Sequence, residues 1–437
     1  MERKPLCVHV TTMGCSKNLV DSEILMGRMK EAGFDVVHQK AVEKADVAVI
    51  NTCGFIEESI AENIRQILEI TNEKAHKRVE KVVVMGCLGE RFKAQLQQEI
   101  PEVDKFYGVN ETERLLADLG AKCNWRAQAQ RMLTTPAHYA YLKIAEGCDR
   151  KCSFCTIPAI RGANTSRPLE SLVREAEVLA KAGVKELIII AQDTTRYGVD
   201  IYGKNRLADL IKALEIVEGI RWIRLQYTYP DKTLYDVLDV MKSSQKLCHY
   251  LDIPLQHVSD SVLASMKRGH TKKMICKLLD DFRENIPDIA VRTTIITGYP
   301  GETKEDFDEL KSFVQAYNFE RLGVFAFSPE PGTPAALLPG AVPEIIRQQR
   351  LEELMEIQQE ISRKMNRKKQ GKIIKAIADH KEENYWVMRS QYDSPEVDTE
   401  IYVSEHENIK AGEFYDILIT GAGDYDLYGE WTEIKSY

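Results

Sequence analysis

The sequence predicts an α/β protein with three folded domains. These are an N-terminal open parallel α/β domain, a central partial (β/α)6 barrel of the TIM type, and a small antiparallel C-terminal β-barrel. Apolar runs alternate with amphipathic stretches twice along the chain, and a block of short strands without helical period follows. The 437 residues suffice for about three domains. No apolar run reaches the length of a membrane span, so we expect no membrane segment.

The N-terminal domain, residues 1–123, contains the first alternating series. Helical patterns at Asp21–Ala32 and Ser59–Asn72 separate short apolar runs, which is typical of βαβ units around a parallel sheet. The apolar runs are Leu6–Thr12, Val47–Thr52, Lys81–Met85 and Lys105–Val109. Residues 124–137 are polar and weakly patterned, which predicts a linker.

The central domain, residues 138–341, contains six further β/α repeats. The expected strands are Ala140–Ala145, Glu186–Ala191, Arg221–Gln226, His249–Pro254, Val291–Thr297 and Leu322–Phe327. The expected helices are Leu169–Ala182, Arg206–Val217, Asp231–Lys242, Thr271–Asn285 and Thr303–Tyr317. Six repeats are too few for a closed eight-unit barrel but fit a partial one, and its ligands should gather at the carboxyl ends of the strands.

A charged helix over 342–370 leads into the C-terminal domain, residues 371–437. Five short strands separated by Gly and Asp turns predict a small antiparallel barrel of the OB type. They are Lys372–Ala378, Tyr385–Ser390, Ile401–Ser404, Phe414–Thr420 and Leu427–Ile434. This domain has six Lys or Arg against fifteen Asp or Glu, a net charge of −9 in a chain whose total is −8. Such a domain repels phosphate backbones and fits a basic partner, although a solubilising surface is the alternative.

Cys148, Cys152 and Cys155 form a C-x-x-x-C-x-x-C motif in EGCDRKCSFC, directly after an expected strand. Three thiolates at this spacing can hold a 4Fe-4S cluster and leave one iron open to a substrate-like ligand. A structural zinc ion, the alternative, would want a fourth Cys or His nearby. The N-terminus has no secretory pattern, so we expect a cytoplasmic chain whose ten cysteines serve metal or redox chemistry.

This motif resembles that of the radical S-adenosylmethionine (SAM) superfamily. The resemblance implies that the open iron binds the amino and carboxylate groups of SAM, and that SAM cleavage yields a 5′-deoxyadenosyl radical. It also implies that Phe154 lies beside the adenine. Further candidates for the SAM pocket follow three expected strands: Gln192 and Asp193, then Gln256 and His257, then Gly298 and Pro300. An ordinary turn is the alternative for each of these segments.

Three N-terminal cysteines form a second pattern, because Cys15, Cys53 and Cys87 each lie just beyond an expected strand. Adjacent parallel strands would bring these thiols to one edge of the sheet, where α/β sheets bind ligands. We expect a second three-ligand site with an open iron. The alternative is three unrelated buried cysteines. The remaining four, Cys7, Cys123, Cys248 and Cys276, show no such pattern and are interpreted as ordinary thiols.

Together these features make the whole chain similar to the radical SAM methylthiotransferase family. The matching motifs are GCSKNLVDSE (14–23), NTCGFI (51–56), MGC (85–87), EGCDRKCSFC (146–155) and SPEPGTPA (328–335). The resemblance implies two 4Fe-4S clusters, a C-terminal TRAM domain, and replacement of an unactivated C–H by C–S–CH3. One SAM would donate the methyl group and a second would supply the radical. A flavodoxin or ferredoxin and a sulfur donor are the expected partners. An electron-transfer iron–sulfur protein is the alternative class, and it would hold its clusters with four ligands each.

The family divides between enzymes that modify a tRNA adenosine and enzymes that modify an aspartate of small-subunit ribosomal protein S-twelve. GCSKNLVDSE resembles the protein-modifying branch, since the tRNA branch typically reads GCQMN there, and Glu330 stands where the tRNA branch usually has Arg. The charge of −9 also favours a basic protein over RNA. The resemblance thus implies methylthiolation at the β-carbon of that aspartate, with a tRNA adenosine as the alternative. Asp424 and Asp426 are candidate substrate contacts, with a solvent turn as the alternative. No catalytic residue is assigned beyond the cluster cysteines, and a monomer is the default expectation.

Overall fold

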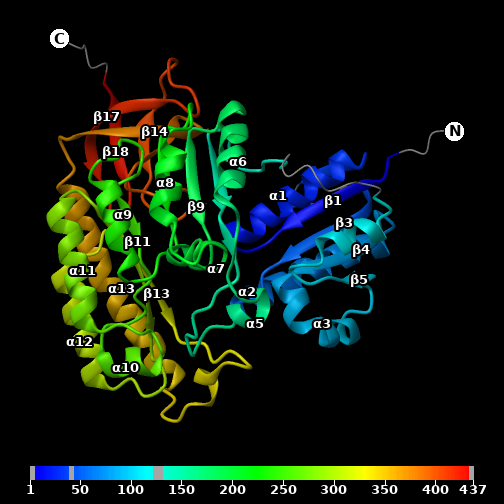
Figure 1. Cartoon of the computed structure of the whole chain (residues 1–437), viewed down its shortest axis with the longest axis horizontal. Coiled ribbons are helices and arrows are strands. Elements are labelled where there is room, and N and C mark those ends of the chain that lie inside the picture. Colours follow the sequence, from blue (N-terminus) through cyan, green and yellow to red (C-terminus); the bar gives the residue numbers. More distant parts are fainter. Residues whose placement is uncertain (1–4, 39–43, 122–130, 433–437) are drawn as a thin grey trace. The chain divides into compact units, whose positions relative to one another are not determined.

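The computed structural model describes residues 5–38, 44–121 and 131–432. Two compact parts make up the chain (Figure 1). The first comprises residues 1–135, 146–150 and 155–164, and the second comprises residues 136–145, 151–154 and 165–437. Within the described ranges, no helix is both long and apolar enough to cross a membrane.

The first part is built on a five-stranded parallel sheet with the strand order β2-β1-β3-β4-β5. Its strands are β1 (Cys7–Thr12), β2 (Asp35–His38), β3 (Ala45–Thr52), β4 (Val79–Gly86) and β5 (Lys105–Phe106). Its helices are α1 (Ser16–Glu31), α2 (Glu57–Ala75), α3 (Cys87–Glu99), α4 (Thr112–Asp118) and α5 (Ile157–Arg161). This order confirms the predicted open parallel sheet and adds β2, which the sequence pattern did not indicate.

Two hydrophobic clusters cover the two faces of this sheet, because side chains alternate along each strand. Ile50 and Val84 face α2 and α3 and pack against Ile67 and Leu88. Val49, Val83 and Met85 face the other way, where α1 and α4 contribute Leu25, Met26, Met29, Leu115 and Leu116 (Figure 1). The chain order reverses between β1 and β3. In open α/β sheets, ligands bind beyond the carboxyl ends of the strands at such a switch point.

The second part contains six parallel strands in two hydrogen-bonded groups, β10-β9-β6 and β11-β12-β13. The strands are β6 (Tyr139–Lys143), β9 (Glu186–Ile190), β10 (Trp222–Leu225), β11 (Tyr250–Asp252), β12 (Ala290–Thr297) and β13 (Arg321–Ala326). The helices are α6 (Leu169–Lys181), α7 (Val199–Tyr202), α8 (Leu207–Glu215), α9 (Thr233–Met241), α10 (Asp260–Ser265), α11 (Lys272–Asn285) and α12 (Lys304–Tyr317). A parallel bridge from Ile223 to Leu247 joins the two groups at β10, as in the predicted partial barrel. Short strands β7 (Ala145–Glu146) and β8 (Thr165–Ser166) and 3-10 helices at Thr194–Arg196 and Pro334–Leu337 complete the elements of this region.

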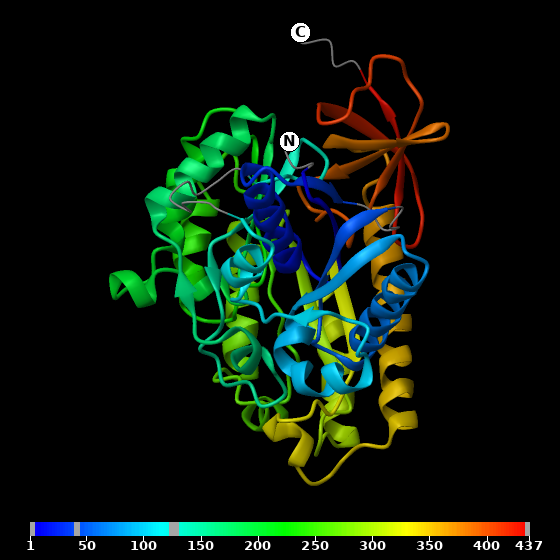
Figure 2. The same cartoon turned by 90° about the vertical axis from the view of Figure 1, so that its right-hand side faces the viewer.

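Helix α13 (Glu344–Arg367) runs beside β12 and β13 and leads into a closed five-stranded barrel (Figure 2). The barrel strands are β14 (Ile373–Glu382), β15 (Tyr385–Ser390), β16 (Ile401–Ser404), β17 (Phe414–Ala422) and β18 (Leu427–Trp431). All five predicted strands are present. The predicted antiparallel barrel is confirmed in four of its five strand pairings, and the fifth, between β16 and β18, is parallel. A closed order of β14-β15-β16-β18-β17 places these two strands side by side although β17 separates them in sequence.

Buried ion pairs join the C-terminal barrel to the amino ends of the central strands. Glu186, the first residue of β9, accepts hydrogen bonds from Arg224 and Arg389 at 2.7 Å each. Arg321, the first residue of β13, pairs with Asp393 in the segment between β15 and β16. All five side chains are at most 9% exposed, so each charge is compensated by its partner. This attachment leaves the carboxyl ends of the strands, where ligands are expected, free of the C-terminal barrel.

The predicted linker 124–137 falls partly outside the described residues, which resume at 131. Residues 131–137 contain neither helix nor strand. Arg131 instead pairs with Glu23 of α1 at 2.7 Å, and the backbone N–H of Thr134 donates to the same carboxylate. The end of this segment is therefore held against the first part.

Candidate functional site

The three N-terminal cysteines lie together at the carboxyl edge of the parallel sheet. Cys15 is the N-cap of α1 after β1, Cys53 follows β3 directly, and Cys87 begins α3 after β4. The pKa of the Cys53 thiol is raised by burial and by the neighbouring Cys15, and Cys15 and Cys53 both raise the pKa of Cys87. Asn18 bonds to Met13 O, Thr52 O and Cys87 Sγ, so the loops that carry the three thiols are neighbours. The predicted convergence is therefore a feature of the structure, at the switch point of the sheet.

Close approach of the three loops depends on glycines beside the cysteines. Gly14 has φ +89°, and a Cβ added there would lie 2.5 Å from Cys53 Cβ and 3.2 Å from Cys53 Sγ. A Cβ on Gly54 would lie 2.8 Å from the backbone of Leu88, next to Cys87. Larger residues would push the loops apart. Gly14 and Gly54 therefore allow the loops that carry the three cysteines to lie close together.

Asn18, buried in the first turns of α1, connects the loops that hold the thiols. Its Nδ2 donates at 3.0 Å both to Met13 O, just before Cys15, and to Thr52 O, just before Cys53. Its Oδ1 lies 3.9 Å from Cys87 Sγ and accepts from that thiol. One amide therefore contacts all three cysteine loops, a role that the sequence pattern did not reveal.

Arg161, the last residue of α5, also contacts this site. Its Nε donates to Cys87 Sγ at 3.4 Å, and its Nη2 donates to Asn18 Oδ1 at 2.5 Å. Burial raises the pKa of the Cys87 thiol to about 11, and the Arg161 charge opposes that shift. A cation that donates to a thiolate favours the deprotonated sulfur that binds metal.

The motif Cys148, Cys152 and Cys155 stands in the loop between β7 and α5, and its ends belong to the first part. The Cys148 N–H donates to Gly162 O at 3.0 Å, and its Sγ accepts from the Arg150 N–H at 3.4 Å. The Asn164 N–H donates to Asp149 Oδ1 at 3.0 Å. These contacts fold the start of the loop back onto the segment after α5.

The middle of the same loop, residues 151–154, belongs to the second part. Arg268 Nη1 donates to Cys152 Sγ at 3.5 Å, and its Nη2 donates to Pro254 O beyond β11 at 2.5 Å. Its guanidinium lies 4.3 Å from the centre of the Tyr229 ring. Arg268 thereby fixes Cys152 to the carboxyl end of a central strand, and it is a second arginine that sequence reasoning missed.

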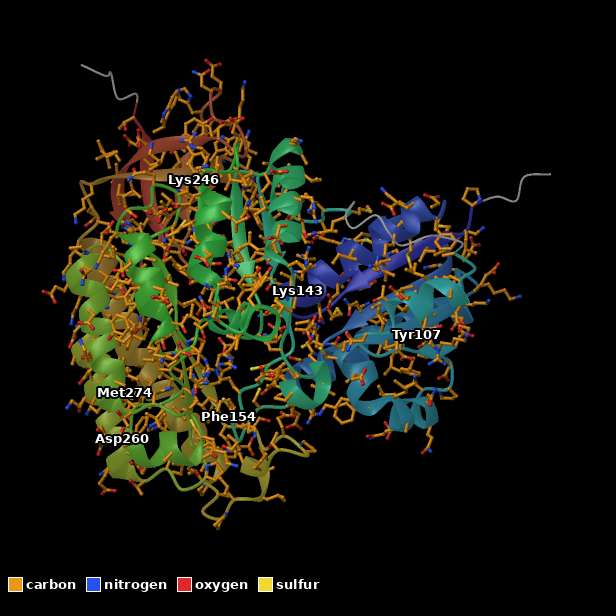
Figure 3. The ribbon with its side chains drawn as sticks, viewed as in Figure 1. Tyr107, Lys143, Phe154, Lys246, Asp260 and Met274 are labelled. Atoms are coloured by element: carbon orange, nitrogen blue, oxygen red, sulfur yellow. The ribbon has the colours of Figure 1, made fainter. Side chains whose placement is uncertain are left out.

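Phe154 packs, partly buried, against a cluster that includes Met266, Tyr299 and Phe327 (Figure 3). The neighbouring Ser153 bonds to the Tyr299 hydroxyl at 2.7 Å and to Ser265 O at 2.9 Å. These contacts hold the loop on the GYPGE turn after β12. The position of Phe154 beside an adenine stays a prediction.

The other predicted pocket residues lie at strand ends, and several have structural contacts there. Asp193 is the N-cap of the 3-10 helix Thr194–Arg196 and accepts from the Thr195 N–H at 3.0 Å. His257 is fully buried, its Nδ1 accepts from the Ser259 N–H at 3.0 Å, and burial lowers its pKa to about 4. Gln192 and Gln256 are partly exposed beyond β9 and β11. The pocket role of these four residues stays a prediction.

Glu302 organises the GYPGE turn that contains Gly298 and Pro300. Its Oε2 accepts from the Gly298 N–H at 2.7 Å and lies 3.6 Å from His257 Nε2, while its Oε1 pairs with Arg350 of α13 at 2.5 Å. A Cβ on Gly298 would collide with the Arg347 side chain. Contacts from helix α13 therefore hold the turn that follows β12. The side chains of this turn are positioned mainly by other residues of the protein.

The nine cysteines among the described residues form no disulfide, and they include Cys7, Cys248 and Cys276, whereas Cys123 lies outside those residues. Across the described ranges, no three Cys, His, Asp or Glu side chains form a group that could hold a metal ion. A cubane cluster binds each cysteine to a different iron, so its ligands surround a wider centre than the ligands of one ion do. That Cys15, Cys53 and Cys87 hold such a cluster stays a prediction.

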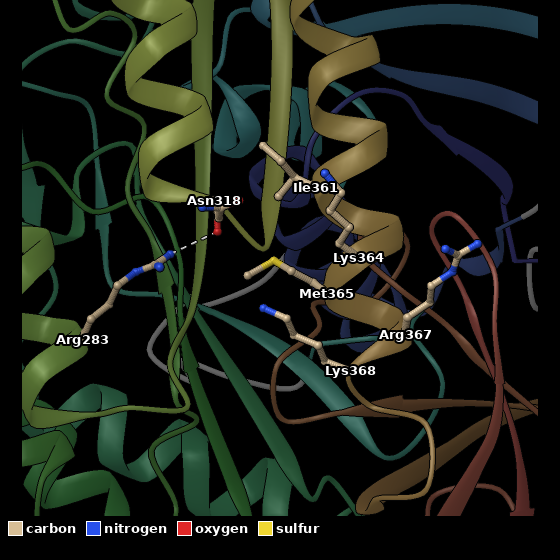
Figure 4. A pocket seen from close by; sticks show the side chains of 7 residues that line it. All are labelled: Arg283, Asn318, Ile361, Lys364, Met365, Arg367 and Lys368. Atoms are coloured by element: carbon tan, nitrogen blue, oxygen red, sulfur yellow. Dashed lines mark hydrogen bonds between the residues drawn. The ribbon is translucent and has the colours of Figure 1, made fainter.

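A basic pocket of about 470 Å³ lies at the carboxyl end of α13 (Figure 4). Arg283 points toward Asn318 and donates to its backbone oxygen at 3.3 Å. The remaining lining residues are Ile361, Lys364, Met365, Arg367 and Lys368. Cations in the last turn of a helix complement its dipole, which accounts for this composition.

Known proteins match every region of the chain. Three family models match: the radical SAM superfamily at residues 142–314, the uncharacterized protein family UPF0004 at residues 7–108, and the TRAM domain at residues 371–432. A protein of Flavobacterium johnsoniae named ribosomal protein uS12 methylthiotransferase RimO is 51% identical over 97% of this chain and 97% of its own length. A Bacteroides fragilis protein of the same name is 46% identical over 98% of this chain and 100% of its own length. The chain belongs to the RimO family.

Membership in this family makes the protein a radical SAM methylthiotransferase, an enzyme that uses an iron–sulfur cluster and SAM. Among solved structures, the radical SAM methyltransferase TsrM from Kitasatospora setae has a TM-score of 0.56 at 15% identity, covering 76% of this chain and 74% of TsrM. The cobalamin-dependent radical SAM enzyme OxsB has a TM-score of 0.52 at 12% identity, covering 82% of this chain and 56% of OxsB. These two likenesses concern the fold alone.

Proposed function

We propose that this enzyme replaces a hydrogen at the β-carbon of an aspartate in ribosomal protein uS12 by SCH3. One SAM donates the methyl group and a second SAM supplies the 5′-deoxyadenosyl radical that removes the hydrogen. Cys148, Cys152 and Cys155 hold the cluster that binds and cleaves SAM, and Cys15, Cys53 and Cys87 hold a second 4Fe-4S cluster. If bound by Cys15, Cys53 and Cys87, a second cluster would supply an open iron able to bind the sulfur to be transferred.

This proposal is supported by two sets of three cysteines in the sequence: Cys148, Cys152 and Cys155 in one loop, and Cys15, Cys53 and Cys87 beyond three parallel strands. A three-cysteine site leaves one of four irons open, so two such sites provide two open positions, one for SAM and one for sulfur. Cys15, Cys53 and Cys87 converge at a glycine-lined sheet edge. Arg161 and Asn18 contact Cys87 there and orient its sulfur. An external flavodoxin or ferredoxin would provide electrons and a separate donor would provide sulfur.

The choice of a basic protein substrate is supported by the relatives, which are named as uS12 methylthiotransferases, and by the charge of −9 in residues 371–437. Both earlier candidates in that domain have internal contacts. Asp424 pairs with Arg363 of α13 at 2.6 Å, and Asp426 accepts from the Glu400 N–H at 3.1 Å. We therefore assign the docking surface to exposed carboxylates elsewhere on the barrel: Glu383, Glu407 and Glu430. A ribosomal substrate implies a reaction in the cytoplasm.

Labelled SAM tests the proposed reaction directly. Reconstituted enzyme with SAM carrying a CD3 methyl group should add about 49 Da to a uS12 loop peptide, against about 46 Da with ordinary SAM. When the β-carbon of the peptide aspartate carries deuterium, one deuterium should appear in 5′-deoxyadenosine for each product formed. A product without the CD3 label, or 5′-deoxyadenosine without deuterium, would exclude this use of the two SAM molecules.

Gly14→Ala is expected to remove the iron of the N-terminal site, because the added Cβ collides with Cys53. Gly33→Ala is the matched control: φ is +84° there as well, but nothing lies within 4 Å of its Cβ. The backbone strain of about 1–2 kcal/mol is common to both variants, so only the collision differs. Iron analysis should give about half the wild-type content for Gly14→Ala and full content for Gly33→Ala. Equal iron in both would contradict the requirement for close approach.

Reversal of the docking charges should weaken substrate binding. The triple variant Glu383→Lys, Glu407→Lys and Glu430→Lys is expected to raise KM for a basic uS12 substrate about tenfold at low salt with little change in kcat, since exposed charges contribute about 0.2–1 kcal/mol each. The control makes the same charge change in the first part, with Glu31→Lys, Glu69→Lys and Glu80→Lys, all exposed in the structure. The same KM in the docking variant and the wild type would rule out this surface.

A further inference from the structure

We propose that Arg161 is a positioning residue that couples the radical SAM loop to the N-terminal thiol site and raises the reduction potential of the cluster held there. This inference rests on the proposed second cluster. Arg161 follows Cys155 by six residues, so it belongs by sequence to the radical SAM motif. Its contacts, however, reach the other cysteine site.

The planar Arg161 guanidinium donates hydrogen bonds to two groups of partners. Toward the N-terminal site, Nε donates to Cys87 Sγ at 3.4 Å and Nη2 donates to Asn18 Oδ1 at 2.5 Å. On its other edge, Nη1 donates to Asp21 Oδ2 at 3.1 Å and to both oxygens of Glu146 at 2.9 Å. A lysine at this position would offer one ammonium group and could not satisfy both edges at once.

The second group of partners ties the radical SAM loop to the same side chain. Glu146 stands two residues before Cys148, and the Cys148 N–H donates to the carbonyl of Gly162, the residue after Arg161. On the other side, Asn18 contacts Met13, Thr52 and Cys87 in the three N-terminal cysteine loops. A movement of Arg161 would therefore displace the start of one cysteine motif and the thiols of the other together.

The position of Arg161 also places a positive charge next to Cys87. The Arg161 side chain is 2% exposed and forms ion pairs with Asp21 and Glu146, and a guanidinium in a protein remains a cation. Without it, the carboxylates of Asp21 and Glu146 would lose a shared positive partner beside Cys87. A donor to a cluster thiolate, together with a nearby positive charge, stabilises the reduced form of the cluster. Loss of the cation should therefore lower the potential of the N-terminal cluster.

The experiment compares Arg161→Gln and Arg161→Lys with Arg114→Gln, an exposed arginine on α4 of the same part. Each full-length enzyme is reconstituted, its iron is counted, and both clusters are titrated by EPR under anaerobic conditions. The signal that is absent from Cys53→Ala enzyme identifies the N-terminal cluster. Formation of 5′-deoxyadenosine and of methylthio product is measured in the same samples.

We expect Arg161→Gln to keep both clusters and to cleave SAM at close to the wild-type rate. Its N-terminal cluster should have a potential lower by about 59 mV, which corresponds to tenfold weaker one-electron reduction. Methylthio product should fall about tenfold, in line with other contacts to metal ligands. Arg161→Lys retains the charge and should recover most of the potential but little of the product, whereas Arg114→Gln should match the wild type.

An unchanged potential in Arg161→Gln would overturn the electrostatic role. Both Arg161 variants could instead lose the N-terminal iron while Arg114→Gln retains it. That result would show that Arg161 only stabilises the fold, and it would also overturn the proposal. Failure of the underlying function has a different signature. If enzyme with Cys15, Cys53 and Cys87 all changed to Ala binds as much iron as the wild type, the second cluster does not exist, whatever the Arg161 variants do.

Discussion

Cys53→Ala enzyme is expected to cleave SAM at close to the wild-type rate and to form no methylthio product. Cys53 lies at the N-terminal thiol site, with its N–H bonded to Asn63 Oδ1 at 2.9 Å, and it makes no contribution to the Cys148–Cys155 motif. Contacts around a metal ligand change activity by about 10- to 100-fold, so loss of the ligand itself should reduce product at least about 100-fold. Mass spectrometry of the substrate and chromatography of 5′-deoxyadenosine measure the two events separately.

Cys276→Ala is the control for this variant, because Cys276 lies on α11 in the second part and has no expected ligand role. It should retain both SAM cleavage and product. Methylthio product from Cys53→Ala at the wild-type level would remove Cys53 from the site. Loss of SAM cleavage together with product would mean that the two cysteine sites do not act independently.

Cys152→Ala should abolish SAM cleavage and, with it, all product. Cys152 is one of three proposed ligands of the radical SAM cluster and accepts a hydrogen bond from Arg268, which is fixed in turn to Pro254 O. A cubane left with two cysteines at this loop has no stable attachment, so iron content should fall by about half and 5′-deoxyadenosine should be absent.

The iron that remains in Cys152→Ala should belong to the N-terminal site, and a further Cys53→Ala change should remove it. Measurable SAM cleavage in Cys152→Ala would show that another group completes the cluster. Complete iron loss from the single variant would show that the two sites assemble together. Cys276→Ala again serves as the control for a cysteine change that leaves the iron unaffected.

Strand-end positions made the convergence of Cys15, Cys53 and Cys87 predictable. Cys15, Cys53 and Cys87 are distant in sequence, yet each follows an apolar run, and parallel strands place such residues at one edge. The repeat of strands and helices also predicted the six central strands within one or two residues of their bounds. Periodicity is a local property, so a single sequence reports it well.

Features that depend on distant partners escaped the sequence pattern. Strand β2 has only four residues, too few for a clear alternation, and the parallel pairing of β16 with β18 arises from barrel closure. Asn18 and Arg161 are single polar residues without a repeating pattern, and their role exists only because α1, β3 and α5 come together. The arginine in the otherwise apolar Ile157–Arg161 segment is the one local sign of a buried charge.

The charged residues at the amino ends of the central strands were likewise unexpected. Glu186 begins one apolar run and Arg224 lies within another. By sequence alone, both runs indicate ordinary buried strands. Their compensation by Arg389 requires the C-terminal barrel. The buried charges thus reflect domain packing, which no local pattern records.

We propose that this enzyme modifies a protein aspartate and not a tRNA adenosine. Anaerobic turnover with reconstituted enzyme, reductant, sulfide and SAM should offer a uS12 loop peptide and an adenosine-containing tRNA stem-loop in the same vessel, with mass spectrometry of both. We expect the mass of the peptide to rise by about 46 Da at the aspartate and the mass of the RNA to stay the same. A gain on the RNA with none on the peptide would contradict it.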